Sequence, residues 1–278
     1  MLDKYLLENY KDIITILVII LIILFIYTYY ISYKICNNEL EYFIYDSQIT
    51  DTSQHKTSPE GPIIMIIGGT HGNEPAGSVA IKKLIEDLNA NKLKIKRGNL
   101  ILVPEVNYCG LKLGIRFILG IGDLNRKYPK KIGDKINSPI NKKIIELANN
   151  SDFILDFHEG WGWHRKNKTS MGSSITPSVT NNSKQMAEIF LDTINKNIKN
   201  DNEKFVILTN DIDLLNLDRY GHSESTEIPG SLRYYLNLIN KDYILIETTG
   251  QDNIQPIDVR VNQNKIFINK LLNYYNII

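Results

Sequence analysis

Residues 13–33 form a run of 21 residues without a charge, IITILVIILIILFIYTYYISY. At about 1.5 Å of rise per residue, a helix of this length crosses the ~30 Å hydrocarbon layer of a membrane. Tyrosines crowd the end of the run, as in an interfacial aromatic belt. A signal peptide has a shorter apolar region and a small-residue cleavage site, and a core helix normally keeps a polar face. The sequence therefore predicts one transmembrane helix over residues 13–33.

The charges beside this run indicate its orientation. Lys4 and Lys11 precede it, whereas Lys34 follows it. Because Lys and Arg near a span favour the cytoplasmic side, we expect a cytoplasmic N-terminus and an exoplasmic or lumenal domain after the membrane. The expected organisation is an N-terminal tail (1–12), the transmembrane helix, a polar linker or edge-strand region (34–60) and a folded domain (61–278).

Composition excludes several classes of protein. The 278 residues carry a formal net charge of +1, so the basic excess of a nucleic-acid-binding protein is missing. The two cysteines, Cys36 and Cys109, are too few for a framework of several disulfides or for a multi-cysteine zinc site. A bound metal ion would therefore need histidine and carboxylate ligands, and the chain has five histidines.

Strands and helices alternate after residue 61. The segment PIIMIIGG (62–69) is a continuous apolar run closed by two glycines, which is typical of a buried central strand. Long loops are expected at 107–135 and 159–182. This alternation predicts an α/β fold with a mostly parallel, mixed sheet and helices on both faces. Further strands are expected at 99–104, 152–157, 204–209 and 242–249, and helices after Pro75 and at 139–149, 183–199, 231–240 and 258–275.

Polar side chains stand at the ends of three of these strands. His71 and Glu74 follow the first strand in the turn GGTHGNEP, His158 follows DFILDF, and Glu247 lies near the end of DYILIETT. In open α/β sheets, ligands bind beyond the carboxyl ends of the strands. Two histidines and a glutamate are a common ligand set for one catalytic Zn²⁺, with an open position for water. A second glutamate, here Glu247, can act as the general base.

The segment DLNRKYP (123–129) lies between these strand ends in the sequence. An arginine guanidinium matches a carboxylate, and an asparagine adds a neutral donor, so Asn125 and Arg126 are candidates to bind a substrate carboxylate. Arg116 is a candidate to polarise the scissile carbonyl. The alternatives are structural fastening of the loop for Asn125 and Arg126, and an ordinary surface position for Arg116.

The ordered motifs GGTHGNEPAG, DLNR, DFHEG and IETTG resemble those of the M14 zinc carboxypeptidase superfamily, most closely the branch of succinylglutamate desuccinylase and aspartoacylase. The resemblance covers roughly residues 61–278 and implies a zinc hydrolase that acts on a carbon–nitrogen (amide or peptide) bond. It implies the following roles: zinc ligands His71, Glu74 and His158; substrate carboxylate binding by Asn125 and Arg126; carbonyl polarisation by Arg116; and general base Glu247.

The chain also departs from the family pattern. The family's DLNR is usually followed by Phe-Pro-Gly, whereas this chain reads KYPKK. About thirty residues follow Glu247, so we expect the β-rich C-terminal domain of the aspartoacylase branch to be absent.

These departures leave the substrate open between an N-acyl amino acid, favoured by the motifs, and a peptide trimmed by a carboxypeptidase. The expected partners are such a substrate and a lipid bilayer, with no nucleic acid. A third hypothesis is a non-catalytic, membrane-tethered binding module.

Overall fold

The computed structural model describes residues 2–36, 40–47, 61–118, 120–209, 219–222, 228–251 and 253–278. Within them, the chain forms an eight-stranded sheet in the order β1-β3-β2-β4-β8-β5-β6-β7. Neighbouring strands are parallel except for the pairs β1/β3 and β5/β8, which confirms the predicted mixed, mostly parallel sheet. The strands are β1 (Phe43–Asp46), β2 (Ile63–Gly68), β3 (Asn99–Val103), β4 (Phe153–Trp161), β5 (Ser174–Pro177), β6 (Val206–Thr209), β7 (Tyr220–His222) and β8 (Asp242–Gln251).

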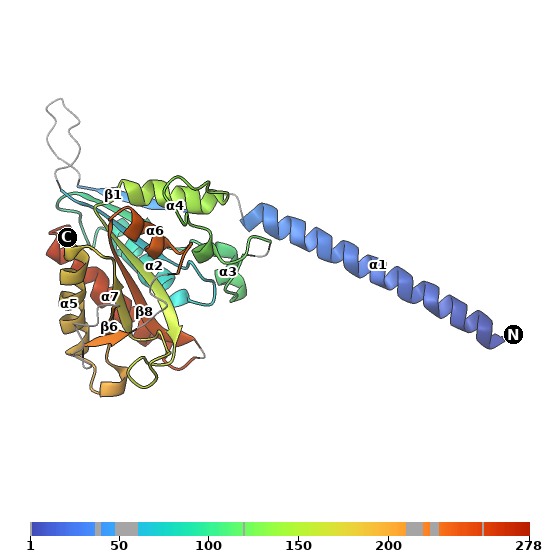
Figure 1. Cartoon of the computed structure of the whole chain (residues 1–278). Helices are drawn as coiled ribbons and strands as arrows, with labels where there is room; N and C mark the ends of the chain where they lie inside the picture. The colour runs from blue at the N-terminus through green and yellow to red at the C-terminus, as the bar shows by residue number, and fades with distance from the viewer. Residues whose placement is uncertain are drawn as a thin grey trace, which may run out of the picture.

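Helices cover both faces of this sheet (Figure 1). One face packs against α2 (Pro75–Asn89), α5 (Asn181–Asn195) and α7 (Ile257–Tyr274) around a core that includes Phe157 and Phe267. The other face packs against α4 (Pro139–Asn149) and α6 (Leu232–Leu238). The central strands are continuous apolar runs because both of their faces are covered. The predicted fold class is confirmed.

The two segments expected to be loops contain regular structure. Residues 107–135 include α3 (Tyr108–Leu113) and a 3-10 turn at Leu124–Arg126. Residues 159–182 include the end of β4 and all of β5. The strand β5 is short and rich in Ser and Thr, so its sequence lacks an apolar pattern, yet it is buried between β8 and β6. In the stretch expected as a linker or edge strand, residues 43–46 form the edge strand β1.

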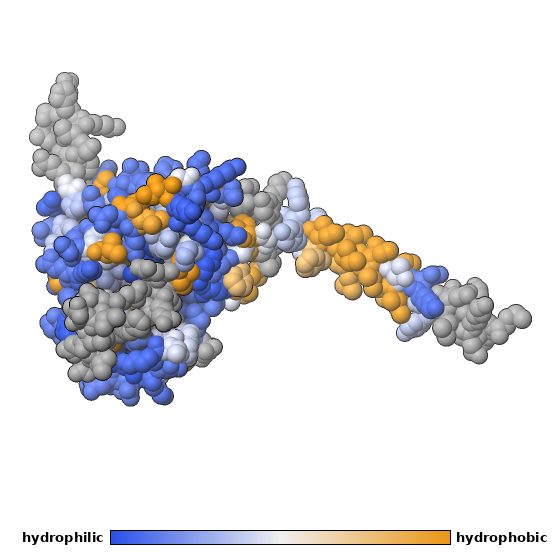
Figure 2. Space-filling model, viewed as in Figure 1, coloured by the Kyte–Doolittle hydropathy of each residue, from blue (hydrophilic) through white to orange (hydrophobic). Residues whose placement is uncertain are grey.

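A single long helix, α1 (Leu2–Cys36), extends away from the domain (Figure 1). It begins earlier than the predicted span at 13–33, and its stretch Tyr10–Tyr30 is long and apolar enough to cross a membrane. The side chains of this stretch are exposed rather than packed in a core, and Figure 2 shows them as an apolar cylinder outside the domain. A helix that is apolar on all sides is normally buried, either in a protein core or in a membrane. This stretch is not packed in the core of the domain, which favours a membrane span.

Beyond this stretch, α1 is tied to the domain by a disulfide between Cys36 and Cys109 of α3, whose Cα atoms lie 5.7 Å apart. The sequence excludes a framework of several disulfides, but it does not reveal that its two cysteines pair. The bond fixes the C-terminal end of α1 against α3 and therefore against the loops that follow β2 and β3.

This pairing predicts the thiol content of the protein. After denaturation without reductant, we expect the chain to react with no equivalent of a maleimide, because both sulfurs are in one disulfide. After reduction, both cysteines should react. Mass spectrometry of the alkylated chain measures this. Two alkylated cysteines before reduction would contradict the pairing.

Candidate metal centre and active site

The turn after β2 and the ends of β4 and β8 meet at one edge of the sheet. His71 and Glu74 lie in the turn between β2 and α2, and the backbone N–H of Glu74 donates to the carbonyl of His71 (3.1 Å). His158 in β4 is the register partner of Glu247 in β8. Register partners on parallel strands point to the same face. The structure therefore brings together four residues from three segments that are far apart in the sequence.

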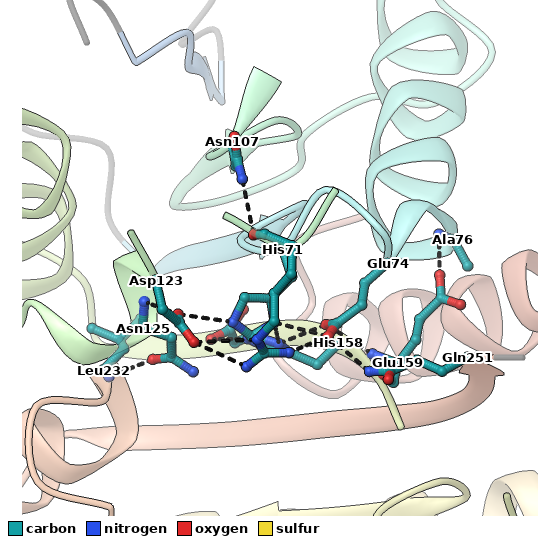
Figure 3. A network of polar contacts seen from close by, with 12 residues as sticks. His71, Glu74, Ala76, Asn107, Asp123, Asn125, His158, Glu159, Leu232 and Gln251 are labelled. Carbon is teal, nitrogen blue, oxygen red and sulfur yellow. Dashed lines mark hydrogen bonds and ion pairs between the residues drawn. The ribbon is translucent and has the colours of Figure 1, made fainter. Parts of the chain in front are cut away.

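His71, Glu74 and His158 form a compact cluster of buried ligand atoms (Figure 3). The Nδ1 atom of His71 lies 2.8 Å from Glu74 Oε1, the Nδ1 atom of His158 lies 2.9 Å from Glu74 Oε2, and the two Nδ1 atoms are 3.1 Å apart. These three residues form a group that can hold a metal ion.

The spacing of this cluster fits zinc. Two atoms that are each about 2.0–2.1 Å from a tetrahedral zinc ion lie about 3.3 Å apart. The observed separations of 2.8–3.1 Å are slightly shorter, as expected where hydrogen bonds link the same atoms. Nitrogen and oxygen donors in a His₂Glu set are also the donors that zinc accepts in hydrolytic sites.

The outward ring nitrogen of His71 is hydrogen-bonded to an aspartate, and that of His158 is within ion-pair distance of another. The Nε2 atom of His71 lies 3.2 Å from Asp123 Oδ1 (Figure 3), and the Nε2 atom of His158 lies 3.4 Å from Asp156 Oδ2. Tyr243 donates a hydrogen bond of 2.9 Å to the same oxygen of Asp156. A carboxylate on one ring nitrogen orients the ring and makes the other nitrogen a better metal ligand. Both rings therefore present Nδ1 to the cluster.

Glu74 is held by three further donors. Its Oε1 accepts from Arg116 Nη1 and from Gln251 Nε2, both at 3.1 Å, and its Oε2 accepts from the backbone N–H of Glu159 at 3.1 Å. Although burial alone raises the pKa of Glu74, the charges and hydrogen bonds of His71 and His158 lower it to about 2. The carboxylate is therefore ionised and fixed in orientation, as a metal ligand needs to be.

Glu247 is in a different environment. Burial, together with the charge of Glu74, raises the pKa of its carboxyl to about 8, against the opposing effect of His158. A raised pKa makes a carboxylate a stronger base, and general bases work best when their pKa lies near the operating pH. Glu247 therefore combines a position beside His158 with the proton affinity that a general base needs.

The predicted carboxylate-binding residues lie in the turn that follows Asp123, whose carboxylate contacts His71 and accepts from the backbone N–H of Asn125. Asn125 accepts a hydrogen bond of 2.9 Å from the backbone N–H of Leu232 through Oδ1, so it does fasten the 3-10 turn to α6 (Figure 3), and its amide NH₂ is outside that bond. Arg126 is exposed, and its Nη1 donates to the carbonyl of Asn125 (2.7 Å). Arg116 is not an ordinary surface residue, because it contacts Glu74 and donates to Asp123 Oδ2 from Nε and Nη2.

Several residues that support the cluster were not identified from the sequence. Asp156 could have been predicted, because it lies two residues before His158 in the same strand and therefore points to the same face of the sheet. Glu159 lies on the opposite face, where its carboxylate is buried, accepts from the backbone N–H of Ala76 (2.5 Å) and pairs with Arg260 of α7. An arginine in an amphipathic helix reads as a solvent-facing residue, so this pair had no sequence signal.

Known proteins resemble this chain in sequence and in fold. Residues 60–196 match the family model of the succinylglutamate desuccinylase/aspartoacylase catalytic domain. Over 107 residues, the chain is 36% identical to the N-alpha-acetyl-L-2,4-diaminobutyric acid deacetylase of Halomonas elongata. The aligned region covers 36% of this chain and 29% of that protein.

Two solved structures share the fold. Tripeptide-bound cell shape determinant Csd4 from Helicobacter pylori has a TM-score of 0.63 and 20% identity, over 86% of this chain and 56% of that chain. A succinylglutamate desuccinylase from Silicibacter sp. has a TM-score of 0.53 and 18% identity, over 78% of this chain and 58% of that chain. This chain thus spans little more than half of these structures. The match of residues 60–196, which contain three of the four motifs, confirms the resemblance to the succinylglutamate desuccinylase/aspartoacylase catalytic domain.

Proposed function

We propose that this protein is a membrane-anchored, zinc-dependent hydrolase that cleaves an amide bond next to a free carboxylate in N-acyl amino acids. The observation that carries the proposal is the buried cluster of His71, Glu74 and His158 with Glu247 beside it on the same face of the sheet. A zinc ion held by these three ligands would supply a Lewis acid that polarises a carbonyl and lowers the pKa of a bound water.

The residues around the cluster have different roles in the proposed hydrolysis. Glu247 takes a proton at its carboxylate from the attacking water and delivers it to the nitrogen of the leaving amine. Arg116, whose guanidinium already contacts Glu74, stabilises negative charge on the carbonyl oxygen. Asn125 and Arg126 bind the substrate carboxylate, which fixes the scissile bond over the cluster, and such positioning contributes several kcal/mol to catalysis.

The deacylase assignment rests on the relatives. The similar Halomonas protein is a deacetylase of an acetylated amino acid, and the matching family model is that of desuccinylases and aspartoacylases. The second candidate is a carboxypeptidase that trims peptides, because the fold is also that of Csd4, which was solved with a bound tripeptide and is described as a D,L-carboxypeptidase. Both reactions need a carboxylate next to the scissile amide, so the same residues serve either one.

We further propose that α1 spans the membrane and that the domain lies on the exoplasmic or lumenal side. The excess of Lys before the span favours this orientation. The disulfide between Cys36 and Cys109 favours it independently, because disulfides persist in oxidising compartments and are rare in the cytosol.

A substrate panel tests the enzymatic proposal. The full chain in detergent micelles is incubated with N-acetyl and N-succinyl amino acids and with short peptides, each in a free-acid and a C-terminally amidated form. We expect turnover of the free acids, loss of turnover with a chelator and recovery with Zn²⁺. Amidated analogues should react at least about 100-fold more slowly, because the groups that bind the carboxylate are left unpaired.

The panel also separates the alternatives. Preference for acyl amino acids supports the deacylase, and preference for peptides supports the carboxypeptidase. Turnover that survives the chelator would contradict a metal-dependent reaction. Absence of both stoichiometric zinc and chelator-sensitive turnover would identify a binding module instead.

A further inference from the structure

The described residues 108–118 and 120–122, called the rim segment below, join the end of α1 to the candidate active site. The segment contains α3 and the loop after it, and Cys109 within it is bonded to Cys36. A second contact lies closer to the membrane span. A β-carbon at Gly120 would lie 2.6 Å from the hydroxyl of Tyr29, so the tyrosine side chain lies directly against this glycine.

The contact with Tyr29 sets the height of the rim segment relative to a bilayer. Tyr29 is in the last turn of the apolar stretch Tyr10–Tyr30. Cys36 lies seven residues further along α1, which is about 10 Å of helix. A loop that touches Tyr29 therefore extends below the disulfide, toward the level at which the apolar stretch ends. If α1 spans a membrane, that level is the boundary between headgroups and hydrocarbon.

The surface of the rim segment has the composition of a membrane-contacting surface. Three of its large apolar side chains are exposed: Tyr108 by 45%, Leu113 by 62% and Phe117 by 50%. Lys112 lies over the ring of Tyr108, with Nζ 4.4 Å from the ring centre. Residues 108–122 include no acidic residue and two basic ones, of which Lys112 belongs to this surface and Arg116 is paired with Glu74 and Asp123. Aromatic and aliphatic side chains with flanking cations are favoured at the interface of an anionic bilayer.

The rim segment also contacts the turn between β2 and α2 that carries His71 and Glu74. A β-carbon at Gly72 would lie 1.9 Å from the backbone carbon of Gly110, so this turn packs directly on α3. Arg116, in the same segment, donates to Glu74. Asn107 caps α3 by accepting from the N–H of Gly110, and its Nδ2 donates to the carbonyl of Arg116. A surface that contacts the rim segment would therefore lie close to the cluster of His71, Glu74 and His158.

We propose that the rim segment is an interaction surface for an anionic lipid bilayer, in which Leu113 and Phe117 enter the headgroup region. This inference rests on the proposed membrane anchor and deepens the proposed function. It places the site at the bilayer surface, so the substrate is one that is presented at or close to the membrane.

Brominated lipids measure this contact. The full chain is reconstituted in nanodiscs of phosphatidylcholine and phosphatidylglycerol, in which bromines near the headgroup quench nearby tryptophans. Phe117→Trp is compared with Val179→Trp, a matched control that is 48% exposed and lies two residues before α5. The helix α5 is on the side of the domain opposite α1 (Figure 1). After subtraction of the signal of the parent chain, we expect quenching of Phe117→Trp to be about three times that of Val179→Trp or more.

A third variant separates this inference from the anchor. Leu21→Trp, in the middle of the apolar stretch, should be quenched by lipids brominated deep in their acyl chains. Strong quenching of Leu21→Trp with equal quenching of Phe117→Trp and Val179→Trp would overturn the rim contact and leave the anchor intact. Failure of Leu21→Trp to be quenched would overturn both. Neither result depends on enzymatic turnover, so the hydrolase proposal is tested separately.

Discussion

Replacement of Glu247 by Gln is expected to lower kcat by about 10²–10⁴-fold, which is the contribution of a positioned general base, while zinc stays bound. Gln has the shape of Glu, but its amide cannot take a proton from water at neutral pH. Glu247 is outside the three-residue ligand cluster, so its removal should leave metal content unchanged. Turnover of the preferred substrate and metal analysis of the same preparation measure both effects.

The control for this variant is Glu86→Gln, which makes the same chemical change on the exposed side of α2. It should retain the kcat and the zinc content of the parent. If Glu247→Gln loses zinc, then Glu247 is a ligand or supports one, and its assignment as the base is wrong. If Glu247→Gln turns over at the parental rate with zinc bound, then another group accepts the proton.

The meeting of distant residues at the cluster could be predicted from the sequence because it depends on buried strands. The segments 62–69 and 152–157 are mainly apolar, so they read as buried strands of a mostly parallel sheet, and polar residues at their carboxyl ends are expected at one edge. His71 and His158, 87 positions apart, do lie in contact. The positions of His71 and His158 at the sheet edge thus follow from the burial of the strands before them, which the apolar runs in the sequence reveal.

The supporting contacts could not be predicted in the same way because they depend on how side chains pack. Glu159 and Arg260 come from different elements and pair only after α7 docks on the sheet. A disulfide requires two Cα atoms within about 4.4–6.8 Å, a condition that a sequence separation of 73 residues does not reveal for Cys36 and Cys109. The strand β5 is held by its neighbours rather than by an apolar pattern of its own.

Replacement of His158 by Gln is expected to abolish stoichiometric zinc binding, and turnover with it. The amide of Gln fills similar space but is a poor zinc ligand, so two of the three proposed ligands remain. The measurement is thermal unfolding with and without Zn²⁺. A ligand that binds the folded state raises the unfolding temperature, so the parent chain should gain stability on addition of zinc, whereas His158→Gln should gain none. The chelated forms of both proteins provide the baseline for any loss of stability caused by the substitution itself.

Asp156→Asn is the matched comparison, because it changes the group behind His158 and leaves all three ligands in place. Loss of such a supporting carboxylate weakens metal affinity by about 10–100-fold. We therefore expect Asp156→Asn to regain both its zinc-dependent rise in unfolding temperature and its turnover when zinc is raised by that factor, while His158→Gln regains neither. Equal recovery of the two variants would show that His158 supports the site without binding the metal, and the His₂Glu assignment would then be wrong.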